Sequence, residues 1–355
     1  MTPRAPIAYP ASDLDQIHDP GPAAAVERTD RALALIRPDE LGAPIRQRQP
    51  SARPGAEILV GTASWTDPTM TRGGVFYPRG VSSAEERLRY YASQFPVVEV
   101  DSSYYSLPER ATAELWAKRT PADFVFHVKA HALLTGQPTE VARLPAPLID
   151  ALPAAVADKR RLYAKDLSLE LYDAVWNRFL DALAPLAEAG KLGGILFQYP
   201  RWFLPTPANK DQLAETAARL AGIPATVELR NQMWFGSKRS TEWTIDLLRD
   251  LGLTHVVVDG PQGLKSSVPF VPAVTTPALA VIRLHGRRSA TWEAAKVPTV
   301  ERYRYLYSER ELQPLVSAAE AISTQAARTT VLFNNCYANY GATNAREFIA
   351  RLGTN

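Results

Sequence analysis

The stretch ALAVIRLHG, residues 278–286, is an apolar run that carries Arg283 and His285 only near its C-terminal end. A charged side chain inside an apolar strand is costly unless it is paired, so this stretch predicts a buried strand that ends in a polar network. Seven other stretches have the same form, and a helix is expected after each of the eight. They are ILVGTASW (58–65), VVEVDSSYY (97–105), FVFHVKA (124–130), GGILFQYP (193–200), ATVELR (225–230), THVVVDG (254–260) and VLFNN (331–335).

Eight strands that alternate with helices predict a (β/α)8 barrel of the α/β class. The strands are almost continuously apolar, as expected for a parallel sheet that is covered on both faces. Barrels of this kind keep their catalytic groups at the C-terminal ends of the strands, where the polar residues of this sequence lie. The sequence therefore predicts the position of a site more clearly than its reaction.

The barrel is expected to span residues 57–355 and to follow a Pro/Ala-rich extension over 1–56, which has one short helical pattern at 23–36. A helical insertion is predicted after the third strand, at about 131–170. Its basic cluster favours a solvated surface over a phosphate-contacting one, because charge runs usually face water. The aromatic and basic segment 287–307 is expected to cover the site. The basic cluster consists of Lys159, Arg160, Arg161 and Lys165.

Capping boxes mark two helix starts within the barrel. Ser82 or Ser83 is followed three residues later by Glu85 or Glu86, and Ser308 is followed by Glu311. A serine side chain can accept a hydrogen bond from the third helical residue while the glutamate bonds back to the serine backbone. Helices are therefore expected to begin directly after these serines.

Composition narrows the class of protein. The chain has 355 residues, 46% of them hydrophobic, and a net charge of +3, which is too balanced to require a polyanionic partner. The single Cys336 excludes an internal disulfide and a thiolate zinc cluster. Neither a membrane-spanning run nor a secretory signal is present in the sequence. We expect a cytoplasmic protein with no membrane partner; its oligomeric state cannot be predicted.

Several strings together resemble the domain-of-unknown-function family 72, also called the YecE-like proteins. They are GTASW, FYP, VEVDSSYYSLP, FVFHVKA, ILFQYP, VELRNQMW, VVVD, RLHG and FNN. The resemblance covers about Gly61 to the C-terminus and omits the extension. It implies a TIM-type barrel and brings no established reaction. The family pattern has Asn and Phe where this chain has Asp101 and Tyr104.

Side chains two residues apart on a strand share a face, so the polar residues form pairs that are expected to converge at the barrel mouth. Arginines bind phosphate or carboxylate through two parallel hydrogen bonds, and a lysine adds a point charge, so the cations predict an anionic ligand. A screened carboxylate and an imidazole are usable for proton transfer. The candidate catalytic residues are Glu228, His285 and Asp259. The candidate substrate-binding residues are Arg230, Arg283, Lys129, Gln198, Asn335, Trp65, Glu99, Asp101, Tyr105 and Trp234.

Two details of these assignments stay open. Asn334 is the alternative to Asn335, because an error of one residue in strand phase exchanges the two. Aromatic residues around the mouth could stack against a sugar ring or a nucleobase, or could belong to the core. These aromatic residues are Trp65, Tyr104, Tyr105, Trp202, Trp234 and Trp292.

The leading hypothesis is an enzyme that uses acid/base chemistry on a small anionic or polyhydroxylated, sugar-like substrate. A hydrolase, lyase or isomerase without a redox cofactor would fit. The alternatives are a nucleic-acid binding or processing protein, which would use the same basic mouth, and a non-catalytic metabolite-binding barrel. A glycosidase with Glu99 and Glu228 as its two acids is weakened because their strands stand nearly opposite each other.

Two further readings concern the polar residues themselves. A buried network of Glu228, Arg230, Arg283 and Asp259 that only holds the barrel together is a structural alternative to catalysis. A divalent metal on Asp101, Glu228, Asp259 and His285 is disfavoured by the interleaved cations, so no metal or other cofactor is expected.

Overall fold

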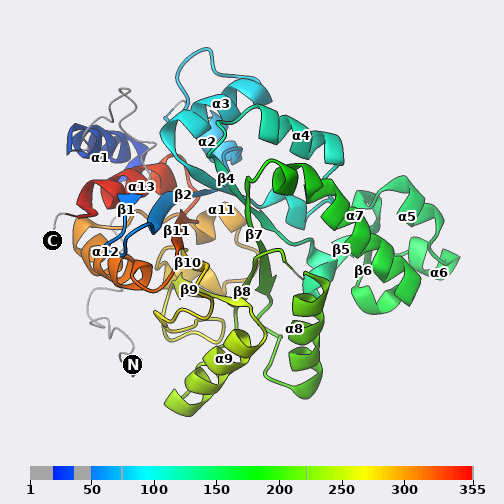
Figure 1. Cartoon of the computed structure of the whole chain (residues 1–355). Coiled ribbons are helices and arrows are strands. Elements are labelled where there is room, and N and C mark those ends of the chain that lie inside the picture. Colours follow the sequence, from blue (N-terminus) through cyan, green and yellow to red (C-terminus); the bar gives the residue numbers. More distant parts are fainter. Residues whose placement is uncertain (1–18, 36–48, 73–74, 221, 354–355) are drawn as a thin grey trace.

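The computed structural model describes residues 19–35, 49–72, 75–220 and 222–353. Eight parallel strands form a sheet in which the first strand also pairs with the second, so the sheet closes on itself (Figure 1). The predicted (β/α)8 barrel is therefore confirmed. In chain order its strands are β2 (Glu57–Ala63), β3 (Val97–Val100), β4 (Val125–Lys129), β7 (Leu192–Tyr199), β8 (Ala225–Leu229), β9 (Thr254–Asp259), β10 (Leu279–Leu284) and β11 (Arg328–Phe333).

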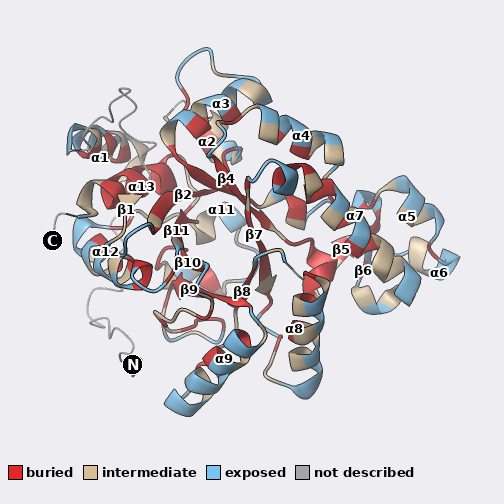
Figure 2. Cartoon of the chain, viewed as in Figure 1, coloured by how far each residue is buried: buried red, intermediate tan, exposed pale blue. Residues whose placement is uncertain are grey.

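Helices surround the barrel and bury one face each against the strands, whose residues are almost all buried (Figure 2). Both capping boxes are present, at Ser83 with Glu86 and at Ser308 with Glu311. None of the described helices combines the length and apolarity needed to cross a bilayer. The helices that follow strands are α2 (Pro68–Arg72), α3 (Ala84–Gln94), α4 (Arg110–Lys118), α7 (Leu169–Glu188), α8 (Pro207–Arg219), α9 (Lys238–Asp250), α12 (Glu309–Ser323) and α13 (Tyr340–Arg351).

One expected helix is absent. The connection from β9 to β10, residues 260–278, contains no helix, although one was predicted after every strand. Proline lacks a backbone N–H and its ring clashes with the preceding turn, so four prolines over this span prevent a helix from propagating. They are Pro261, Pro269, Pro272 and Pro277.

The insertion after the third barrel strand is less helical than predicted. It combines helical segments of three to five residues with a two-stranded antiparallel sheet, and Figure 1 shows it beside α7. Its basic cluster is exposed, and Lys159 pairs with Asp166 and Arg161 with Glu140, as the solvated-surface interpretation expects. The elements are η3 (Ala132–Thr135), β5 (Thr139–Glu140), η4 (Val141–Arg143), α5 (Ala146–Asp150), α6 (Ala154–Ala157), β6 (Arg161–Leu162) and η5 (Ala164–Asp166).

The described part of the N-terminal extension packs on the barrel. The predicted helix is present as α1 (Gly21–Leu35), which lies against α13 (Figure 1). Arg28 bonds Glu347 of α13 at 2.7 Å and also donates to the Tyr307 carbonyl. After the segment 36–48, which lies outside the described residues, β1 (Gln49–Pro50) pairs antiparallel with β2.

Candidate functional site

Arg283 lies at the centre of a buried ion-pair cluster inside the barrel. Its Nε and Nη2 atoms donate to the carboxylate of Glu99 at 2.8 and 2.6 Å, and its Nη1 donates to Glu228. The arginine side chain is 2% exposed and both glutamates are fully buried. Residues from β3, β8 and β10 thus meet in the barrel, as the alternation of side chains predicted. The guanidinium bonds these two carboxylates. The structure therefore gives no support to the substrate-binding role predicted for Arg283.

Glu228 is the most heavily hydrogen-bonded carboxylate of the cluster. One of its oxygens accepts from Gln198 at 2.7 Å, from Arg230 at 2.8 Å and from His285 at 3.1 Å, while the other accepts from Arg283. Burial alone would raise the pKa of Glu228, but the charge of Arg283 and the bonds from its other partners hold that pKa well below its usual range. Glu228 is therefore an ionised anchor for its neighbours, a poor match to the proton-transfer role predicted for it.

His285 is held as a neutral imidazole. Its Nε2 faces Glu228, and its Nδ1 lies 2.8 Å from the side-chain amide of Asn334. Donation from Nε2 to the carboxylate and acceptance at Nδ1 from the amide satisfy both nitrogens with a single ring proton. Burial lowers the pKa of His285 to about 4 despite the neighbouring Glu228. Of the two adjacent asparagines, it is Asn334 that joins the cluster.

Lys129 and Asp101 form a second group at the same rim. The register pairs Glu99 with His127 and Val100 with Val128, and Asp101 and Lys129 are the next residues of the two segments. The Lys129 ammonium lies 4.5 Å from the centre of the Tyr104 ring. Burial and then the charge of Arg283 lower the pKa of Lys129 to about 8, while burial raises that of Asp101 against the effect of the lysine. Among the described residues, neither side chain forms an ion pair.

A cavity of about 380 Å³ opens next to the cluster. Gln198 and Arg230 line it and also bond Glu228, and Gln137 lines it while accepting from the Tyr104 hydroxyl at 2.9 Å. Part of its remaining wall comes from the segment 287–307, which contains α10 (Ser289–Trp292) and α11 (Thr299–Arg302) and covers this part of the mouth as predicted. The end of β7 and the residues after it, 199–202, supply another part. Further lining residues are Arg201, Trp202, Trp292, Arg302 and Tyr303.

Arg230 is the cation of the cluster that faces the cavity. Its Nη1 bonds Glu228, and its guanidinium lies 4.7 Å from the centre of the Trp292 ring. Its other guanidinium nitrogens make no hydrogen bond to the described residues, and the side chain is 14% exposed. Arg230 can therefore bind an anionic group of a ligand without losing its position.

Asp259 does not join the cluster, contrary to the prediction. Its carboxylate accepts several hydrogen bonds from Arg287, at 2.9 to 3.2 Å, and one from the Tyr307 hydroxyl at 2.6 Å. The Tyr307 ring packs on Phe333 and its hydroxyl accepts from the Gly286 backbone. Asp259 thus belongs to a separate buried pair on the helix side of the sheet, where it holds the start of the segment 287–307.

Three other predicted residues are structural. Trp65 is buried and packs edge-on against Trp116 at 5.9 Å. Trp234 stacks on Phe203 and donates from its indole nitrogen to that residue's carbonyl at 2.7 Å. The Asn335 amide donates to the Tyr305 carbonyl at 2.8 Å and to Asn344. None of the three side chains is among those that line the mouth cavity.

Tyr105 is the predicted aromatic residue that is exposed near the rim, where its ring contacts that of Tyr104 at 4.9 Å. Sequence reasoning missed Gln137, which lies in the insertion, and Tyr303, whose ring lies 6.0 Å from His285. The aromatic and basic character of the segment 287–307 was the signal for Tyr303. No strand pattern marked Gln137.

The glycosidase alternative does not fit this arrangement. Glu99 and Glu228 do not flank an open space, because Arg283 lies between them and bonds both. Among the described residues, no three His, Cys, Asp or Glu side chains are placed to hold a metal ion. Glu228, Arg230 and Arg283 form a paired network, while Asp259 is outside it.

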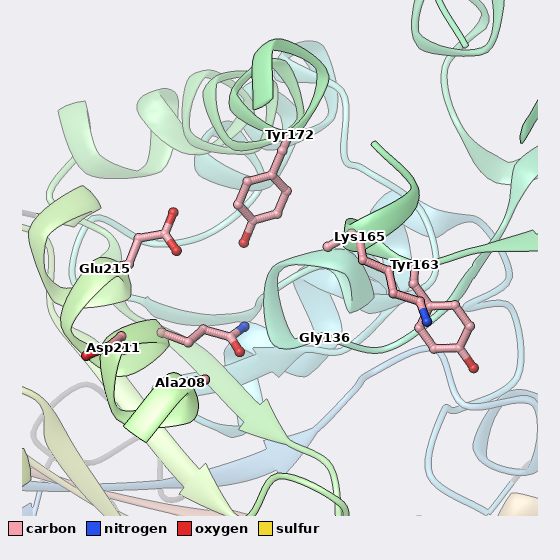
Figure 3. Close-up of a pocket in the computed structure, with 9 residues that line it drawn as sticks. Gly136, Tyr163, Lys165, Tyr172, Ala208, Asp211 and Glu215 are labelled. Carbon is pink, nitrogen blue, oxygen red and sulfur yellow. The ribbon is translucent and has the colours of Figure 1, made fainter. Parts of the chain in front are cut away.

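A second hollow, of about 590 Å³, lies away from the barrel mouth, between the insertion and helices α7 and α8 (Figure 3). Tyr163 and Lys165 from the insertion line one side of it, and Tyr172, Asp211 and Glu215 from the two helices line the other. Glu215 is already paired with Arg219 at 2.8 Å. We assign no chemistry to this surface groove.

The fold and the site define a (β/α)8-barrel protein with a buried ion-pair cluster beneath a basic and aromatic cavity at the C-terminal mouth. Residues 59–355 match the family model described as protein of unknown function DUF72, and the chain belongs to this family. The resemblance seen in the sequence is confirmed. The N-terminal extension precedes the matched region.

Relatives with a known sequence or structure agree with this assignment. The UPF0759 protein YunF of Bacillus subtilis is 29% identical over 298 residues, which cover 83% of this chain and 94% of that protein. The crystal structure of a DUF72 family protein from Thermotoga maritima is 28% identical, with a TM-score of 0.64 over 82% of this chain and 97% of that one. A DUF72 family protein from Enterococcus faecalis is 27% identical, with a TM-score of 0.62 over 82% and 95% of the two chains.

Proposed function

We propose that the protein is an enzyme that performs acid/base chemistry on a small anionic substrate at the barrel mouth. The observation that supports this proposal is the pair Asp101 and Lys129: they follow residues that are in register on β3 and β4, and neither forms an ion pair among the described residues. Arg283 and Arg230, in contrast, each bond a buried carboxylate. A carboxyl with a raised pKa and an amine with a lowered pKa are suited to exchange protons near neutral pH.

Arg230 supplies the anion-binding group. It projects from the cluster into the cavity and is oriented by Glu228 and by the Trp292 ring. Gln198 and Gln137 line the same cavity and can bond the hydroxyl or carbonyl groups of a substrate. Glu99, Arg283, Glu228 and His285 act in this proposal as positioning residues that hold Arg230 and set the electrostatic environment of Lys129.

The charge distribution favours a small molecule over a nucleic acid. A protein that follows a phosphate backbone needs a continuous basic surface leaving the site. Lys159 of the insertion is instead paired with Asp166, Arg160 and Arg161 lie near Glu140, and the mouth arginines lie around a cavity. The cavity has the size and the mixed polar and aromatic lining of a metabolite site.

The test is a thermal-shift screen of phosphorylated and carboxylated metabolites, followed by turnover assays on the compounds that bind. Arg230→Met should weaken binding about tenfold to a hundredfold, the range for loss of a charged hydrogen bond. Arg178→Met, which removes an arginine paired with Glu109 away from the mouth, is the matched control and should bind normally. Lys129→Met should bind and not turn over. Equal affinity of the Arg230 variant, or unchanged turnover of the Lys129 variant, would reject the proposal; binding without turnover by the wild type would identify a non-catalytic receptor.

A further inference from the structure

Lys129 differs from every other cation of the cluster in what surrounds it. Arg283 bonds two carboxylates and Arg230 bonds one, whereas the Lys129 amine has an aromatic ring as its contact and no ion-pair partner among the described residues. It is half-buried at the end of β4, and the Arg283 guanidinium is close enough to act on its charge. A lysine that is desolvated and placed next to a second cation is an activated nucleophile.

A carboxyl group accompanies this amine. Asp101 follows Val100 of β3, Lys129 follows Val128 of β4, and Val100 and Val128 are in register. Burial raises the pKa of Asp101, so the group retains a proton at higher pH than an exposed aspartate. A neighbouring amine and proton donor are the two groups needed to add a nitrogen to a carbonyl carbon and to expel water.

We propose that the substrate is an aldehyde or ketone that carries a phosphate or carboxylate group, and that Lys129 forms an imine with its carbonyl carbon. This inference rests on the proposed function and names its substrate class. Arg230 binds the acidic group. Gln137 lines the same cavity as Arg230 and accepts a hydrogen bond from the Tyr104 hydroxyl, and the Lys129 ammonium lies 4.5 Å from the centre of the Tyr104 ring, at the edge of that cavity.

The step balances with the groups in place. The lone pair of the neutral Lys129 amine attacks the carbonyl carbon, and one amine proton passes to the oxygen to give a carbinolamine. The carbinolamine hydroxyl then leaves as water with a proton from the Asp101 carboxyl, which becomes a carboxylate. The product is an iminium ion, which withdraws electrons from the adjacent carbon and makes proton removal or carbon–carbon cleavage there easier.

The test uses pyridoxal 5′-phosphate and pyridoxal, two aldehydes that differ only in the phosphate, followed by borohydride reduction and peptide mapping of the full chain. Near pH 7.5, about a quarter of an amine with a pKa of about 8 is neutral, against about 0.1% of an ordinary lysine. We therefore expect the reduced adduct on Lys129 to form at least tenfold faster than on any surface lysine. Lys210, whose ammonium lies 4.1 Å from the Trp243 ring centre, is the internal control, because it shares the aromatic contact without the cluster.

The phosphate should lower the concentration of aldehyde that half-labels Lys129 about tenfold relative to pyridoxal, and Arg230→Met should remove this difference. Lys129→Met should abolish the fast adduct while Lys210→Met leaves it unchanged. The wild-type peptide map gives the result even if a variant misfolds. Two results together would overturn the imine and leave the proposed function standing. Pyridoxal phosphate would give a thermal shift that depends on Arg230, but Lys129 would be labelled no faster than Lys210. No thermal shift and no preferential labelling would count against both.

Discussion

Replacing Arg283 by methionine is the sharpest test of the buried cluster. The substitution removes three N–H donors, two to Glu99 at 2.8 and 2.6 Å and one to Glu228, and leaves two fully buried carboxylates facing an apolar side chain. Methionine fills much of the arginine stem, so the cavity left behind is small. The loss of stability should therefore report the uncompensated charges.

Removing one partner of a buried ion pair costs about 3–5 kcal/mol, a large fraction of the roughly 5–15 kcal/mol that separates a folded domain from its unfolded state. Burial already raises the pKa of Glu99 in the wild type, against the effect of Arg283, and without the guanidinium this pKa will rise further. The pKa of Glu228, which Arg283 holds low, will rise as well. The folded variant then binds protons that the unfolded chain does not, so its deficit is largest near neutral pH and shrinks as the pH falls through those raised values. The difference in the free energy of unfolding between the variant and the wild type should thus become smaller as the pH falls from about 8 to about 5.

Chemical denaturation at several pH values measures this effect. Arg110→Met is the control, because Arg110 pairs with Asp181 through a side chain that is 41% exposed, and the loss of an exposed pair should cost far less stability. Adding Glu99→Gln to Arg283→Met should recover part of the loss by removing one uncompensated charge. If Arg283→Met and Arg110→Met destabilise equally, or if the deficit does not change with pH, the cluster does not have the electrostatic role assigned to it.

Two further predictions concern histidines. Asn334→Asp places a carboxylate beside Nδ1 of His285, which favours the imidazolium, so the pKa of His285 should rise from about 4 toward neutrality in an NMR titration; an unchanged value would contradict the contact. The wild type should lose stability as the pH falls below about 6.5, by about 1.4 kcal/mol per pH unit for each buried histidine. The reason is that the histidines of the unfolded chain bind protons at a higher pH than the same histidines in the folded protein. Denaturation midpoints that stay constant down to about pH 5 would refute this prediction. The residues concerned, with pKa values lowered to about 3, 4, 4 and 4, are His127, His131, His255 and His285.

The fold was predictable because each barrel strand is a short apolar run between turn signals, and that pattern is local. The same local signals were present where the prediction failed. The four prolines of the segment 260–278 exclude a helix, whereas the alternation of strands and helices in the rest of the chain predicts one there. The insertion gave no such signal, since helical segments of four or five residues and paired strands of two residues are too short to show a period.

The site was predictable only as far as strand phase could be inferred. In β8 and β10 the charged residues are two apart in an apolar background, which fixes the face they share. In β9 the residues between His255 and Asp259 are all valine, so the pattern does not say which face is inside, and Asp259 points to the helix layer. Asn334 and Asn335 are adjacent, so they point to opposite faces of the strand. The sequence does not show which of them faces the cluster, and the coordinates do.

The roles of the cations were beyond the sequence for a different reason. Lys129 and Arg283 look alike in the chain, each a cation two residues from a histidine at the end of an apolar strand. What separates them is how many carboxylates each bonds, and the partners of Arg283 are 184 and 55 residues away in sequence. An arginine that bonds two buried carboxylates is neutralised and becomes structural, whereas Lys129 forms no ion pair among the described residues, has a lowered pKa and stays available to a ligand. Long-range pairing therefore decides which cation holds the barrel together and which can react.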